Sequence, residues 1–148
     1  MDRPPRPVVD LTSHCACGRV TVQLSGKVRA MLLCACEDCQ RATGTGHSTV
    51  VLASVDDVSI SGEPRGFASA ANSGATFTRS FCPHCGTPIC GRSSRAPQLI
   101  MLPVGLFGAG ADWFAPAQMI FARSHRDWDL IPEGLPRHDT YRDPGSLA

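Results

Sequence analysis

The chain has 148 residues, which is long enough for one domain with a hydrophobic core. Its formal net charge is +1 and its charged residues are scattered, so the basic face of a nucleic-acid-binding protein is not expected. No apolar stretch approaches the ~20 residues that a membrane span needs, and the start lacks a signal-peptide stretch, which together predict a cytoplasmic protein.

Residues 1–10 are rich in proline and arginine and predict a flexible N-terminal arm. Beyond it, short alternating apolar and polar stretches are bounded by glycine and proline turns, a pattern typical of β-strands. The expected strands are residues 19–25, 30–34, 47–53, 58–61, 75–82, 87–91, 98–104 and 118–122, with an extended segment ending at residue 71. A short helix is expected over residues 37–43, closed by Gly44.

These elements predict a mainly β protein with a single domain over residues 11–142 and a tail at 143–148. Trp128 and Tyr141 are expected to anchor the polar C-terminal segment.

Eight cysteines are the dominant clue to function. Because reducing compartments disfavour disulfides, clustered cysteines there indicate metal or redox chemistry. They occur as C-x-C-G at 15–18, C-x-C-x-x-C at 34–39, C-x-x-C-G at 82–86 and a lone Cys90.

The first and third motifs predict one closed structural zinc site. A close pair lets two sulfurs reach one tetrahedral ion from a single turn, and the following glycine suits that turn because it tolerates positive φ. The expected ligands are Cys15, Cys17, Cys82 and Cys85.

The middle motif supplies only Cys34, Cys36 and Cys39. Three protein ligands with one exchangeable position is the arrangement of a catalytic zinc site. Three thiolates make the metal a poor Lewis acid, which suits a site that holds an incoming thiol as a nucleophile better than one that activates water. The motif therefore predicts thiol addition or elimination.

The order C-x-C-G, C-x-C-x-x-C and F-C-x-x-C-G-T-P resembles the glutathione-dependent formaldehyde-activating enzyme family, also called the GFA or CENP-V domain family. The likeness runs from about His14 to Tyr141 and includes Gly44, Arg79, Pro116 and Trp128. The resemblance implies an Mss4-like (β-tent) fold of twisted antiparallel sheets with at most one or two short helices. It also implies a structural zinc on the two outer pairs and a labile catalytic zinc on the middle motif.

The same resemblance implies a carbon–sulfur lyase, since the family's namesake reaction condenses glutathione with formaldehyde to S-(hydroxymethyl)glutathione. The expected partners are a small thiol, such as glutathione, and an aldehyde or thio-adduct, and a homodimer stays open. The family commonly reads C-H-C-x-x-C, whereas Ala35 stands between Cys34 and Cys36 in this chain. This departure leaves the thiol and the carbon substrate open.

Several roles have alternatives. His47 is the candidate general acid or base, against a surface or packed histidine. Cys90 is either a small buried residue or a fourth ligand that closes the second site. In the latter case both zinc sites are structural and the domain is a non-catalytic binding module. A nucleic-acid zinc ribbon would need a basic face, and a methionine sulfoxide reductase would need a redox cysteine free of metal.

Overall fold

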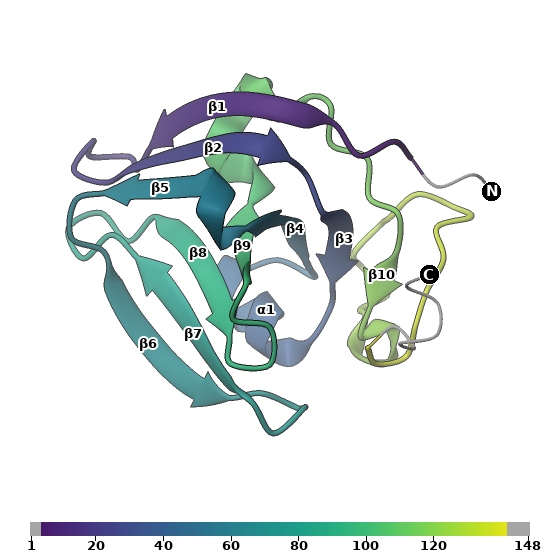
Figure 1. Ribbon diagram of the computed structural model, residues 1–148. Coiled ribbons are helices and arrows are strands. Elements are labelled where there is room, and N and C mark those ends of the chain that lie inside the picture. Colours follow the sequence, from purple (N-terminus) through teal and green to yellow (C-terminus); the bar gives the residue numbers. More distant parts are fainter. Residues whose placement is uncertain (1–3, 142–148) are drawn as a thin grey trace. The chain divides into compact units, whose positions relative to one another are not determined.

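The computed structural model describes residues 4–141, and these fall into two compact units. The sheet unit comprises residues 5–30 and 51–114, and the helix unit comprises residues 31–50 and 115–141 together with Pro4. Figure 1 shows the elements of both units along the chain. Within residues 4–141, no helix has the length and apolar character needed to cross a bilayer.

The sheet unit contains a three-stranded antiparallel sheet in the order β1-β2-β5. Its strands are β1 (Val8–His14), β2 (Thr21–Lys27) and β5 (Val58–Ser61), and a 3-10 turn, η1 (Val55–Asp57), precedes the last of them. The alternation in β2 places Val22 and Leu24 in the core, where both are fully buried.

The same unit contains four further antiparallel strands in the order β9-β8-β7-β6 (Figure 1). They are β6 (Arg65–Ala70), β7 (Thr76–Phe81), β8 (Pro88–Ser93) and β9 (Leu99–Pro103), followed by the 3-10 segment η2 (Val104–Ala111). A register shift at Ser80/Phe81 interrupts the β7–β8 ladder directly before Cys82. β7 ends one residue after the shift, where the third cysteine motif begins.

The helix unit is built around β3 (Ala30–Cys34), whose side chains from Met31 to Cys34 are all buried. β10 (Met119–Ile120) pairs with β3 in parallel, with Met119 opposite Leu33. The other elements are α1 (Glu37–Thr43), the first residues of β4 (Ser48–Ser54), and η3 (Ala122–Ser124).

The structure confirms the mainly β fold class, and α1 has the predicted bounds. Gly44 ends α1 with φ 70°, a left-handed conformation that favours glycine. Tyr141 packs edge-on against Phe121, with ring centroids 4.8 Å apart, as expected of an anchor.

Two predictions are wrong in part. The arm expected at residues 1–10 extends too far, because residues 8–10 already pair with β2 as the start of β1. Trp128 was expected to anchor the C-terminal segment, but its side chain is 69% exposed. The tail at residues 143–148 lies outside the described residues.

Candidate metal centres

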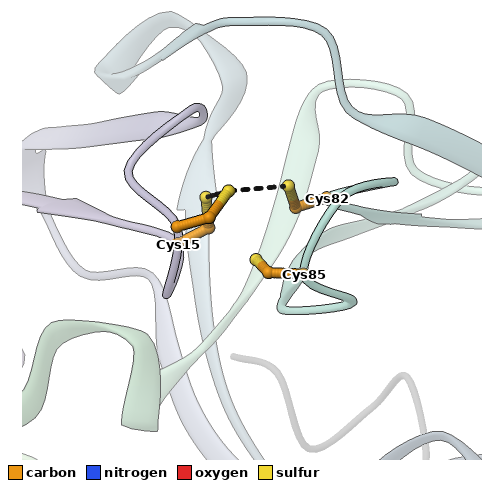
Figure 2. Close-up of side chains that lie close together, drawn as sticks. Cys15, Cys82 and Cys85 are labelled. Carbon is orange, nitrogen blue, oxygen red and sulfur yellow. Dashed lines mark hydrogen bonds between the residues drawn. The ribbon is translucent and has the colours of Figure 1, made fainter.

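The two outer cysteine pairs meet in the sheet unit. Figure 2 shows Cys15 on one loop facing Cys82 and Cys85 on another. The Sγ atoms of these three residues and Cys17 all lie within 4.8 Å of one another. The Cys15–Cys17 and Cys17–Cys82 sulfur distances are 3.6 Å and 3.7 Å. A tetrahedral zinc with Zn–S bonds of about 2.3 Å requires sulfur–sulfur separations of about 3.8 Å, so this set of donors fits a zinc ion.

Both loops have the predicted glycine geometry. Gly18 and Gly86 have φ angles of 80° and 77°. Their backbone N–H groups donate to the carbonyl oxygens of Cys15 and Cys82, at 3.0 Å and 2.8 Å respectively. The positive φ therefore closes each turn around its first cysteine, as the motif predicts.

Thr87, the residue after the third motif, connects the two loops. Its Oγ1 accepts the N–H of Ala16 at 3.1 Å and lies 3.2 Å from Sγ of Cys85. Hydrogen bonds from the hydroxyl and the backbone N–H of Thr87 lower the pKa of Cys85 to about 5. Thr87 therefore favours the thiolate form of Cys85, which is the form that binds a metal ion.

The three remaining clustered cysteines lie in the helix unit, at the start of α1. Cys34 is the last residue of β3, and Cys36 caps α1 by accepting the N–H of Cys39 at its Sγ, at 3.3 Å. The three Sγ atoms lie within 4.8 Å of one another. Cys34 and Cys39 are buried, whereas Cys36 is half-buried.

Their electrostatics favour a bound cation. The thiols of Cys36 and Cys39, together with burial, raise the pKa of Cys34 far above its ordinary value. Three crowded thiolates are therefore unfavourable without a positive charge among them, and a divalent ion that prefers sulfur supplies that charge. The donor set fits zinc.

Ala35, which departs from the family pattern, is fully buried between two of these cysteines. Its N–H donates to the carbonyl of Ile120 at 3.0 Å, and its carbonyl accepts Nε2 of Gln40 at 2.8 Å. Both backbone groups are thus fixed, so the ligand loop is tied to α1 and to β10.

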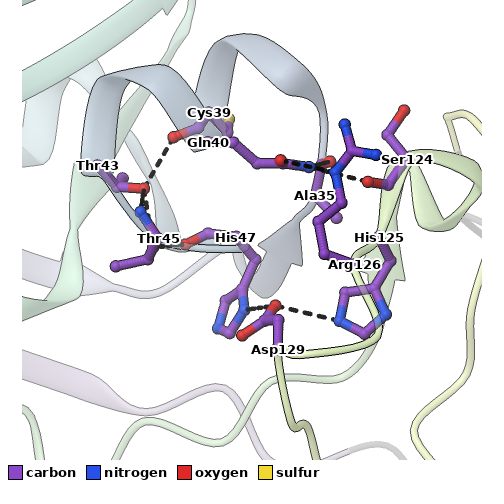
Figure 3. A network of polar contacts seen from close by, with 10 residues as sticks. All are labelled: Ala35, Cys39, Gln40, Thr43, Thr45, His47, Ser124, His125, Arg126 and Asp129. Carbon is purple, nitrogen blue, oxygen red and sulfur yellow. Dashed lines mark hydrogen bonds and ion pairs between the residues drawn. The ribbon is translucent and has the colours of Figure 1, made fainter.

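His47, the predicted acid or base, has a partner that sequence reasoning missed. Its Nδ1 lies 2.7 Å from Oδ2 of Asp129, and Nε2 of His125 lies 3.1 Å from the same oxygen (Figure 3). Asp129 is 82 residues from His47 in a segment that reads as a polar tail. The available signal was Gly46, which leaves space where the carboxylate approaches the chain.

Cys90 lies in β8 opposite Ser80 of β7. Burial raises the pKa of Cys90, although a hydrogen bond with Ser80 opposes the shift. A raised pKa favours the neutral thiol, and the side chain of Cys90 is half-buried rather than buried as predicted.

The chain resembles known proteins in sequence and in fold. The family model described as glutathione-dependent formaldehyde-activating enzyme matches residues 10–124. The chain is also similar to the crystal structure of a Rhodobacter sphaeroides protein, a Northeast Structural Genomics target, with a TM-score of 0.54 and 17% identity over 67% of this chain and 89% of that chain. At this identity the likeness shows the fold alone. No curated protein matches the chain.

Proposed function

Because the chain belongs to the glutathione-dependent formaldehyde-activating enzyme family, we propose that it is a zinc-dependent carbon–sulfur lyase. Its substrates are a low-molecular-weight thiol, such as glutathione, and an aldehyde, or the adduct of the two. The observation that carries the proposal is the group formed by Cys34, Cys36 and Cys39, which has three thiol donors where a closed tetrahedral site needs four.

The chain contributes the ligands and their positions. Cys34, Cys36 and Cys39 would hold the metal at the start of α1, and the fixed backbone of Ala35 keeps two of them in place. A zinc ion held there would keep one coordination position open. Its three thiolate ligands would make it a weak Lewis acid, which favours a sulfur ligand over water at that position.

The reaction balances without an oxidant or a reductant. The thiol gives its proton to a base, for which His47 is the candidate, and the sulfur electron pair forms a bond to the aldehyde carbon. The carbonyl π pair moves to the oxygen, which takes up that proton and becomes a hydroxyl. One thiol and one aldehyde give one S-(hydroxyalkyl) adduct, and the reverse direction is the lyase reaction.

We also propose a cytoplasmic setting with small-molecule partners, and no nucleic acid or membrane partner. The structure joins none of the eight cysteines in a disulfide, which suits a reducing compartment. The scattered charges of the chain offer no basic stripe for a phosphate backbone.

The test follows exchange of isotope-labelled formaldehyde with thiol adducts in the presence of the zinc-loaded chain. Because thiols and formaldehyde also combine unaided, the readout is acceleration over the same mixture without protein. We expect Cys36→Ser to reduce the zinc content from about two ions per chain to about one and to remove the acceleration, with circular dichroism unchanged.

Cys90→Ala is the matched control and should retain both zinc ions and the acceleration. If Cys90→Ala loses the second metal instead, Cys90 is the fourth ligand and the alternative, a binding module with two structural zinc sites, is supported. A fully zinc-loaded wild-type chain that neither binds nor converts glutathione, cysteine or another biological thiol would also favour that module.

A further inference from the structure

Two histidines of the helix unit share one carboxylate oxygen. His47 Nδ1 and His125 Nε2 lie 2.7 Å and 3.1 Å from Oδ2 of Asp129. Figure 3 shows the carboxylate between the two imidazole rings. The side chains of His47, Asp129 and His125 are 19%, 12% and 13% exposed. Water therefore competes little for these hydrogen bonds, while part of each ring stays accessible.

The backbone leaves room for the Asp129 carboxylate beside His47. A Cβ atom on residue 46 would lie 2.3 Å from Cγ of Asp129, so Gly46 leaves the space that the carboxylate occupies. The N–H of Asp129 donates to the carbonyl of Arg126 at 3.0 Å, which fixes the loop that carries it. Gly46 and the Arg126–Asp129 turn together place the carboxylate beside His47.

The shared carboxylate decides the tautomers of both rings. An ionised carboxylate only accepts hydrogen bonds, and each of its oxygens has two lone pairs. His47 must then donate from Nδ1, which leaves the lone pair of its Nε2 free to accept a proton. His125 donates from Nε2 to the second lone pair of the same oxygen.

The backbone of His47 is also tied to the helix that carries Cys39. Thr43 Oγ1 donates to the carbonyl of Cys39 at 2.8 Å, and Thr45 Oγ1 donates to the carbonyl of His47 at 2.7 Å. The two hydroxyl groups lie 2.8 Å apart (Figure 3). The segment between the third cysteine ligand and His47 is thus held at both ends.

We propose that Asp129 and His125 are positioning residues for His47 as the base of the thiol–aldehyde reaction, an inference that rests on the proposed function. Nε2 of His47 takes the thiol proton while the sulfur pair forms the C–S bond, and the same proton then passes to the oxygen of the former carbonyl. The Asp129 carboxylate stabilises the imidazolium that exists between these two transfers. His125 keeps the carboxylate oriented toward His47.

The first test is independent of turnover. Nitrogen NMR of the zinc-loaded chain, at a pH about two units above the ordinary histidine pKa, should show His47 with its proton on Nδ1. Gly46→Ala, which displaces the carboxylate, should raise the share of the Nε2-protonated form. A wild-type His47 protonated on Nε2 would overturn the proposal.

The second test separates positioning from folding. We expect Asp129→Asn and Gly46→Ala to lower kcat roughly tenfold or more, with KM for the thiol within about threefold and the zinc content unchanged. Asp127→Asn removes an exposed charge from the same loop and should change none of these values. His125→Gln, which retains an N–H donor, should retain more activity than His125→Leu.

The outcomes distinguish the two proposals. Undiminished kcat in Gly46→Ala and Asp129→Asn, with an active wild type, would overturn the positioning role alone. A zinc-loaded wild type without any turnover would overturn the lyase proposal and the positioning role with it, whatever the tautomer of His47.

Discussion

Replacing Cys82 with alanine should unfold the sheet unit, because Cys82 belongs to a cross-link between distant parts of the chain. Sγ of Cys82 lies 3.7 Å from Sγ of Cys17, and 65 positions separate the two residues. The metal leaves when the chain unfolds, so it stabilises the folded state by its binding free energy, which is about 10–16 kcal/mol for structural zinc in small peptides near neutral pH. Since a domain of this kind is stable by only about 5–15 kcal/mol, losing one of the four ligands, and with it much of the metal binding, removes much of that stability.

The assay is urea unfolding followed by circular dichroism, with zinc measured in each sample. Cys90→Ala is the matched control, because Cys90 is a half-buried cysteine of the same unit and lies outside the four-cysteine group. We expect the control to unfold near the wild-type midpoint and Cys82→Ala to be unfolded, or nearly so, without urea. A Cys82→Ala chain with the wild-type midpoint and slope would refute the structural zinc site.

Two further predictions concern the metals and the lone thiol. A mild chelator should remove zinc from the three-cysteine group before the four-cysteine group, because fewer protein ligands hold it; release of both metals at one rate would contradict this. Cys90 in the zinc-loaded chain should react with iodoacetamide more slowly than a peptide cysteine at neutral pH, because its raised pKa lowers the fraction of reactive thiolate. The reaction should become faster as the pH rises and that fraction grows. Mass spectrometry checks this, and labelling at the peptide rate would count against the raised pKa of Cys90.

The two cysteine groups could be predicted from the sequence because their members lie within short motifs, and because a closed zinc site needs four thiolates, which joins the first motif to the third. Two or three cysteines within a single turn constrain one another locally, and Gly18 and Gly86 mark those turns. The helix was predicted to the residue for the same reason, since Cys36 caps its start and Gly44 closes its end. The turns and the helix depend on neighbours in the chain and little on the remainder of the fold.

The missed features depend on distant residues. Asp129 meets His47 across 82 positions, and an aspartate between two exposed apolar side chains, Trp128 and Leu130, carries no local signal of that contact. β1 was not predicted at all, because the prolines before it suggest an irregular arm and its alternating residues Val9 and Leu11 are only half-buried. Long-range pairing, which local pattern does not encode, decided both cases.

Each cysteine group draws all its members from one compact unit: Cys15, Cys17, Cys82 and Cys85 from the sheet unit, and Cys34, Cys36 and Cys39 from the helix unit. This division has a consequence for how such a protein can change during evolution. Residues around the three-cysteine loop, such as Ala35 or His47, can be exchanged without touching any ligand of the four-cysteine group. Under the proposed function, a lineage can therefore try new thiols and new carbon substrates at the three-cysteine group while the four-cysteine group continues to secure folding.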